Sequence, residues 1–182
     1  AMLEQVTKAP VRALIGPWNH AFPNDADFGP QIEWREDATR WWDYWLKGRD
    51  TGVLKDPKLI IYMRHWYPPD PNLETVPGEW RAEHSWPPAG LKPMTMFFQA
   101  NHTLAASEST TAQHALKYVP TVGVGAGFWW GELLSDQRPV DAFSLVYDSE
   151  PLKEDLAMMG RPHALLKAAA PAPLANWFVR LS

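Results

Sequence analysis

The stretch Gln31–Lys47, QIEWREDATRWWDYWLK, decides how this sequence is organised. Its apolar residues recur in steps of three and four, which places them along one face of a helix. Acidic residues near the start and a lysine at the end complement the helix dipole, and Gly48 is a common C-terminal cap. We therefore expect a helix over residues 31–47, with an apolar face made by Trp34, Ala38, Trp41, Trp42 and Trp45.

On the N-terminal side of this helix lies the apolar run Val11–Gly16, VRALIG, which Pro17 ends. A run of this length predicts a buried strand, although a short helix has the same pattern. A loop rich in Pro, Asn, Asp and Gly follows up to Pro30, and it contains His20. A histidine at the carboxyl end of a strand is a candidate general base, because ligand and catalytic groups gather there in open α/β sheets.

On the C-terminal side the sequence changes after Gly48. Residues 49–57 have turn chemistry, and short apolar segments separated by Pro and Gly follow them. Recurrent short strands with turn signals indicate a β-sandwich or barrel. The expected strands cover about residues 58–66, 79–84, 94–99, 140–147, 162–168 and 176–181.

Composition excludes several classes of protein. The 182 residues include 18 prolines, which argue against a helical bundle, and 11 tryptophans, which argue against a disordered chain. The absence of cysteine excludes disulfide scaffolds, thiolate zinc sites and cysteine nucleophiles. A net charge of −4 provides no basic surface for nucleic acid, and no apolar run is long enough for a transmembrane helix. We expect a soluble protein without nucleic-acid or membrane partners, and we favour the cytoplasm.

The segments Val11–His20, VRALIGPWNH, and Arg40–Gly48, RWWDYWLKG, resemble the CocE/NonD family of serine hydrolases. This family includes cocaine-esterase-like enzymes and relatives of the X-Pro dipeptidyl-peptidases. The resemblance implies the end of an α/β-hydrolase domain over residues 1–52 and an incomplete C-terminal jelly-roll domain over residues 53–182. The expected fold is mainly β, a galactose-binding-like jelly-roll sandwich preceded by a short α/β-hydrolase remnant with one Trp-rich helix. Later landmarks follow in the family's order: Asp56-Pro57, Trp80-Arg81, Trp86–Pro88, Ser149–Leu152 and Asp155–Gly160.

The resemblance also implies that His20 is the general base of an enzyme that cleaves ester or amide bonds, X-Pro dipeptidyl bonds included. The order in such enzymes is serine, acid, histidine, so the first two are expected upstream of residue 1. No G-x-S-x-G motif occurs in this sequence. We therefore expect the isolated chain to be inactive, as a fragment whose parent acts on ester or peptide substrates, with no cofactor and no metal.

A non-catalytic carbohydrate-binding or interaction module is the alternative, because exposed tryptophans on jelly rolls can bind sugars. Core packing is the simpler interpretation, since large aromatic side chains dominate burial. The tryptophans in question are Trp66, Trp80, Trp86, Trp129, Trp130 and Trp177.

Three further patterns have simple interpretations. The segment 123–127, GVGAG, lacks the spacing of a dinucleotide fingerprint and predicts a loop. The remaining histidines lack the spacing of metal ligands, so a three-histidine site built from separate strands is the less favoured alternative. These histidines are His65, His84, His102, His114 and His163. A solvated surface is favoured over a glycosidase pair for the acidic residues Glu74, Glu79, Glu83, Asp136 and Asp141.

The tryptophans of the helix have one further implication. If the resemblance holds, they face a hydrolase core that is not part of these 182 residues. Large exposed apolar patches usually become interfaces. We therefore expect the chain to self-associate through the Trp34/Trp41/Trp45 face.

Overall fold

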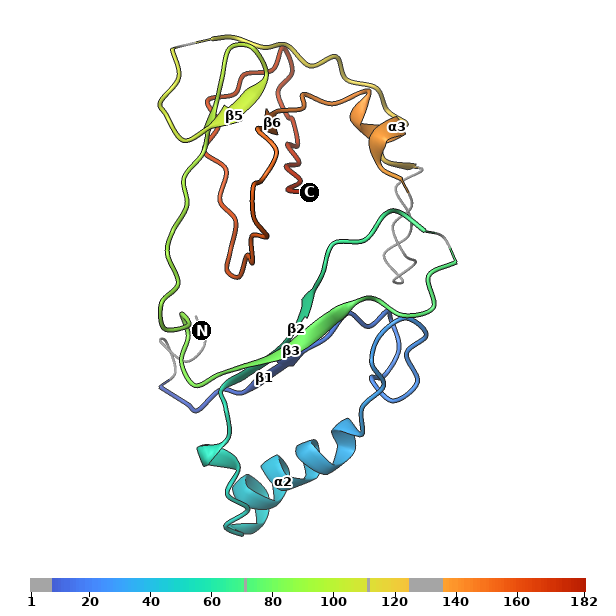
Figure 1. Cartoon of the computed structure of the whole chain (residues 1–182), viewed down its shortest axis with the longest axis vertical. Helices are drawn as coiled ribbons and strands as arrows, with labels where there is room; N and C mark the ends of the chain where they lie inside the picture. Colours follow the sequence, from blue (N-terminus) through green and yellow to red (C-terminus); the bar gives the residue numbers. More distant parts are fainter. Residues whose placement is uncertain (1–7, 71, 111, 125–135) are drawn as a thin grey trace.

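A computed structural model describes residues 8–70, 72–110, 112–124 and 136–182. Two groups of elements lie at opposite ends of the long axis, with β1–β3 and α2 at one end and β5, β6 and α3 at the other (Figure 1). The elements in chain order are β1 (Ala13–Ile15), α2 (Trp34–Lys47), the short 3-10 helix η1 (Val53–Lys55), β2 (Leu59–Arg64), β3 (Gly78–Glu83), β4 (Phe97–Phe98), β5 (Thr103–Ala105), α3 (Arg138–Asp141) and β6 (Asp148–Ser149).

Helix α2 confirms the main prediction from the sequence. The Glu33 side chain caps its start by accepting a hydrogen bond from the backbone N–H of Arg35. Gly48 ends it in the left-handed conformation, at φ +65°, and its N–H binds carbonyls of the last turn. The helix begins at Trp34, three residues later than expected, and before it the N–H of Ile32 donates to the carbonyl of Pro23, at 3.2 Å.

The first sheet has the order β1-β2-β3. Strand β2 pairs in parallel with β1, where Ala13 lies opposite Leu59. It pairs antiparallel with β3 along its whole length, from Leu59 opposite Glu83 to Arg64 opposite Gly78. The strands expected at the first three positions along the chain are therefore confirmed.

The loop between β2 and β3 folds back onto the sheet. The Tyr62 hydroxyl donates to the carbonyl of Val76, and the N–H of Val76 donates to the carbonyl of Phe28. Gly78 is needed at the start of β3, because a Cβ there would lie 2.4 Å from the Met63 carbonyl oxygen. The buried apolar side chains in the described residues include Ala26, Val53, Leu59 and Val76.

The second sheet is small and mixed, with the order β4-β5-β6. Strands β4 and β5 are antiparallel, and β5 and β6 are parallel. Strand β4 lies inside a predicted segment, whereas β5 was not predicted because its three residues are too short for a periodic pattern.

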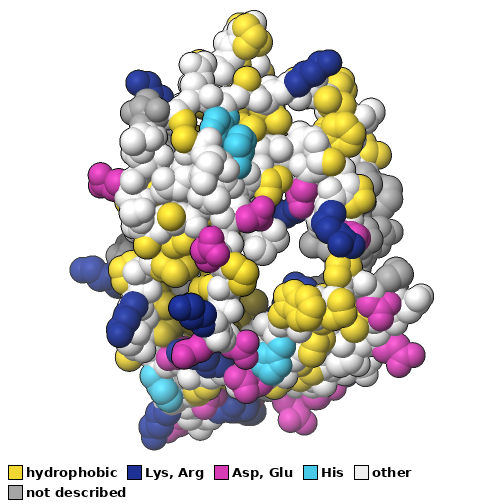
Figure 2. Space-filling view, turned by 45° about the horizontal axis from the view of Figure 1, so that its top comes forward, with side chains coloured by type: hydrophobic (Ala, Val, Ile, Leu, Met, Phe, Trp, Pro, Cys, Tyr) yellow, Lys and Arg dark blue, Asp and Glu magenta, His cyan; other side chains and the backbone are white. Residues whose placement is uncertain are grey.

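Three predicted strands are wrong. The first residues of segment 140–147 belong to α3, which has a proline in its first turn. Segments 162–168 and 176–181 have no regular secondary structure. Trp177, Val179 and Leu181, which form the apolar side of the alternating pattern, are 49%, 58% and 57% exposed, so none of the described residues covers that side. Hydrophobic side chains are accordingly visible across much of the face shown in Figure 2.

The described residues are therefore mostly non-helical, with two small mixed sheets and few helices, which is consistent with a β-rich domain. None of the described helices has the length and apolar character needed to cross a membrane.

Candidate functional site

The loop after β1 carries His20, and Trp18 holds that loop in place. The indole N–H of Trp18 donates to the carbonyl of Pro30, at 3.0 Å. Its ring lies 6.0 Å from the ring of Trp80, measured between centroids, and Trp80 belongs to β3. Trp18 therefore ties both ends of the 17–30 loop to each other and to the first sheet.

Two glycines make room for the Trp18 ring. A Cβ on Gly16 would lie 2.7 Å from atoms of that ring, and a Cβ on Gly29 would lie 2.9 Å from it. Such distances are too short for real carbon contacts, so the tryptophan occupies the space that both glycines leave open. The Gly-Pro-Trp sequence therefore has a packing reason that is independent of catalysis.

Further polar and aromatic contacts hold the 17–30 loop in place, and together with the contacts of Trp18 we call them the brace. The Asn19 side-chain amide donates to Asp27, at 3.0 Å. The Trp34 indole N–H donates to Asn24, at 2.8 Å, and the Trp34 ring stacks on Phe22 with centroids 5.3 Å apart. These contacts connect the loop to the start of α2.

His20 lies on this braced loop, at the carboxyl end of β1, and its side chain is exposed. An exposed imidazole on a positioned loop is accessible to a reacting group as a general base. The structure thus places His20 after the carboxyl end of β1, as expected, and its role as general base stays a prediction.

A cluster of four charged residues, which we call the Arg12 cluster, joins β1, α2 and the start of β2. Arg12 pairs with Asp37 at 2.5 Å and with Asp56 at 3.5 Å. Arg40 pairs with Asp56 at 2.9 Å and with Asp37 at 3.5 Å. The hydrogen bond to Asp56 is the main reason that the pKa of Arg40 is raised above its usual value. The cluster was not predicted from the sequence.

We expect the Arg12→Ala variant to lower the free energy of unfolding by about 2 kcal/mol, because the change leaves two partly buried carboxylates with fewer partners. The Arg12 side chain is only 14% exposed. Urea unfolding followed by circular dichroism measures the change. Arg35→Ala is the matched control, because Arg35 and its partner Glu33 are both exposed. Equal losses of stability in the two variants would show that the Arg12 cluster has no special role.

An aromatic cluster of His102, His114 and Tyr147 joins the β4–β5 turn to the residue before β6. The imidazoles of His102 and His114 stack with centroids 4.1 Å apart. The Nδ1 atom of His114 lies 2.5 Å from the Tyr147 hydroxyl, and its Nε2 atom lies 3.2 Å from the Ala100 carbonyl. Both ring nitrogens of His114 are thus engaged within the protein, which makes this cluster structural in character.

The other histidines lie on other segments of the chain: His65, His84 and His163. In the part of the chain that the structure describes, no three His, Cys, Asp or Glu side chains are grouped so that they could hold a metal ion.

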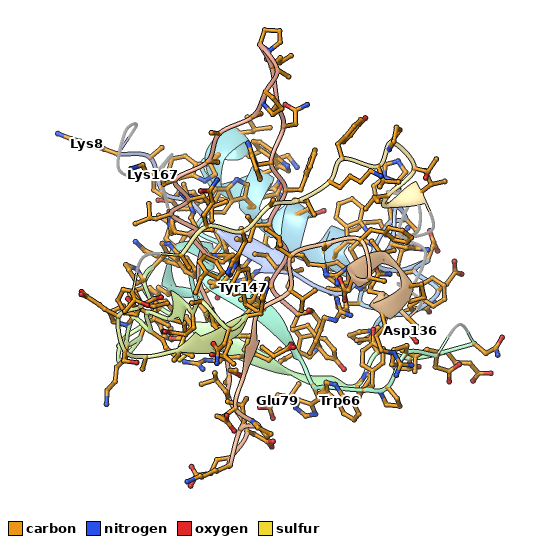
Figure 3. The ribbon with its side chains drawn as sticks, turned by 90° about the horizontal axis from the view of Figure 1, so that it is seen from above. Lys8, Trp66, Glu79, Asp136, Tyr147 and Lys167 are labelled. Carbon is orange, nitrogen blue, oxygen red and sulfur yellow. The ribbon has the colours of Figure 1, made fainter. Side chains whose placement is uncertain are left out.

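The acidic residues considered as a glycosidase pair lie on separate segments, with Glu79 on β3 and Asp136 just before α3 (Figure 3). The side-chain hydrogen bond from Arg138 is the main cause that lowers the pKa of Asp136 to about 2. Asp141 pairs with Arg180. Arginine-paired carboxylates at the surface favour the solvated interpretation.

Of the candidate sugar-binding tryptophans, Trp66 is 86% exposed, while Trp80 packs on Trp18. Trp129 and Trp130 lie outside the described residues, as do the last three residues of segment 123–127.

Residues 37–182 match the family model described as the X-Pro dipeptidyl-peptidase C-terminal non-catalytic domain. The chain belongs to this family. The match confirms the resemblance to CocE/NonD-like hydrolases that the sequence shows.

Two curated mycobacterial proteins are similar over most of the chain. Proteins from Mycobacterium bovis and Mycobacterium tuberculosis, each named "Putative serine esterase", are 24% identical to it over 183 residues. The alignment covers 92% of this chain and 27% of each relative, so the chain spans about a quarter of their length. No solved structure matches this chain.

Proposed function

We propose that this chain is the accessory portion of a serine hydrolase that cleaves ester or amide bonds, X-Pro dipeptidyl bonds included, and that it contributes His20 as general base. The family match over residues 37–182 is the observation that carries the proposal. The names of the mycobacterial relatives support it. In this proposal, residues 1–52 are the end of an α/β-hydrolase domain and residues 53–182 form a jelly-roll sandwich.

The chemistry assigned to His20 is proton transfer. Its imidazole takes the proton from a serine hydroxyl as the serine attacks the substrate carbonyl, and then gives it to the leaving group. The serine, the acid and the oxyanion-hole donors come from a part of the hydrolase outside these residues. The brace made by Trp18 and Asn19 supports this role, because a general base needs a fixed position.

Labelling with a fluorophosphonate probe tests the proposal. We expect no covalent labelling of the 182-residue chain, because it has no nucleophile elbow. The same segment, expressed together with the coding sequence upstream of it in its own gene, is expected to be labelled at a serine in that upstream part. Labelling of a serine within the 182 residues, or no labelling of the longer protein, would contradict the proposal.

A carbohydrate-binding surface is the second candidate, and the 86% exposure of Trp66 is the observation in its favour. Glycan binding by the 182-residue chain that is lost in the Trp66→Ala variant would favour this function.

A further inference from the structure

Asn19 stands directly before His20, and its side chain is held by a residue further along the same loop. The Nδ2 atom of Asn19 donates to the Oδ2 atom of Asp27, at 3.0 Å. A carboxylate accepts hydrogen bonds and does not donate them, so this partner fixes which end of the amide faces it. The NH2 group of Asn19 faces Asp27, and its Oδ1 atom faces away from Asp27.

The Oδ1 atom of Asn19 is buried and has no hydrogen-bond partner among the residues that the structure describes. Most buried polar atoms in proteins are paired, and a buried acceptor without a donor lowers stability. The Oδ2 atom of Asp56 is also buried without a hydrogen bond, but it lies 2.9 Å from the charged Arg40. The Oδ1 atom of Asn19 has no such compensation. Rules of local stability are broken mainly at sites that function requires.

The place of Asn19 in the chain indicates what that function is. Its hydrogen bond to Asp27 restricts the backbone that leads directly into His20. Trp18, one residue earlier, is held by the carbonyl of Pro30. A general base has to lie within hydrogen-bond reach of the proton that it removes, and a displacement of about 1 Å can lower the rate about a hundredfold.

Trp18 and Asn19 contribute differently to the brace. The Trp18 ring fills the space beside Gly16 and Gly29, so it contributes to stability by packing. Asp27 is exposed, so water can replace the Asn19 amide as its partner. A hydrogen bond of this kind adds little net stability, and the buried Oδ1 atom of Asn19 opposes even that. The contribution of Asn19 is therefore orientation rather than stability.

From the hydrogen bond to Asp27, the buried unpaired oxygen and the position beside His20, we propose that Asn19 is a positioning residue. It holds His20 in the orientation in which the imidazole accepts the proton of the nucleophilic serine, and Asp27 anchors it. This inference rests on the proposed hydrolase function and adds two residues to it.

Steady-state kinetics of the longer protein encoded by the same gene test the proposal. We expect Asn19→Ala to lower kcat about tenfold to a hundredfold, because His20 loses its fixed position. KM is expected to change little, because Asn19 acts through His20 and not on the substrate. Asn101→Ala is the matched control, since Asn101 also makes side-chain hydrogen bonds, to Thr103 in the second sheet. Full kcat of Asn19→Ala, or a change in KM alone, would overturn the proposal.

Variants of Asp27 test whether the hydrogen bond is the cause. Asp27→Ala is expected to lower kcat as much as Asn19→Ala, and the double variant is expected to lose no more than either single variant. Asp27→Asn keeps an oxygen that can accept from the Asn19 amide, so we expect it to retain most of the activity. Multiplied losses in the double variant would show that the two residues act separately, contrary to the proposal.

Stability of the 182-residue chain separates positioning from a merely structural role. The urea midpoint of Asn19→Ala is expected to equal or exceed that of the unchanged chain, because the variant removes a buried unpaired oxygen. A clearly lower midpoint would assign the loss of kcat to folding and refute the positioning role.

The His20→Ala variant of the longer protein distinguishes this inference from the proposed function. If His20→Ala keeps full activity, the proposed function itself fails. If His20→Ala is inactive while Asn19→Ala keeps full kcat, only the role of Asn19 fails.

Discussion

Replacing His20 with alanine is expected to lower kcat/KM for ester or amide hydrolysis by about four orders of magnitude in the longer protein that contains this segment. Without the imidazole, the nucleophilic serine keeps its proton and the leaving group receives none. Because the imidazole transfers protons during the reaction and does not bind the substrate beforehand, kcat is expected to fall while KM changes little. Steady-state kinetics with an activated ester measure both.

His163→Ala is the matched control, since it removes an exposed histidine from a segment without regular structure. We expect this variant to keep full activity. Full activity of His20→Ala would show that the family motif does not carry the general base in this protein. Equal losses in the two variants would point to a folding defect.

The Trp18→Ala variant is expected to lower the free energy of unfolding of the 182-residue chain by about 3 kcal/mol. The change removes a ring that fills the space between Gly16 and Gly29 and contacts Trp80. It also leaves the carbonyl of Pro30 without its indole donor. Urea unfolding monitored by circular dichroism measures the loss as a lower midpoint with an unchanged slope.

Trp18→Phe is an intermediate change. Phenylalanine keeps one aromatic ring but loses the N–H and part of the indole packing, so we expect a smaller loss than in Trp18→Ala, of about 2 kcal/mol. Trp66→Ala is the second control, because its ring is 86% exposed. If Trp18→Ala were no less stable than Trp66→Ala, the brace would not hold the loop.

The elements that could be predicted are those with local signals. Helix α2 combines a helical period, acidic residues at its start and a glycine cap, and all of these lie within the helix and its flanking residues. Strands β1, β2 and β3 are short apolar or alternating runs with turn residues on either side.

The predictions that failed depend on distant partners. Alternation at Trp177, Val179 and Leu181 satisfies the strand pattern, but a strand also needs a neighbour for its backbone hydrogen bonds. Sequence spacing does not identify that neighbour. The predicted jelly roll needs such pairings throughout, and it therefore stays a prediction for residues 53–182.

The candidate site divides in the same way. His20 is found by its motif, but the reason for the preceding Gly-Pro-Trp is visible only when Gly29 and Pro30 return to the Trp18 ring. The Arg12 cluster brings together residues up to 44 positions apart, from Arg12 to Asp56. Its one local signal is the Asp37/Arg40 spacing of three residues on the helix.

The parallel pairing of β1 with β2 limits where this protein can be shortened. A chain that starts at residue 53, the expected domain boundary, would lose β1 and leave one side of Leu59, Ile60 and Ile61 unpaired. An apolar strand with a free edge invites pairing with other chains, and so promotes aggregation. Shorter versions intended for crystals or binding assays should therefore begin before Arg12, so that β1 and its arginine remain in place to cover that edge.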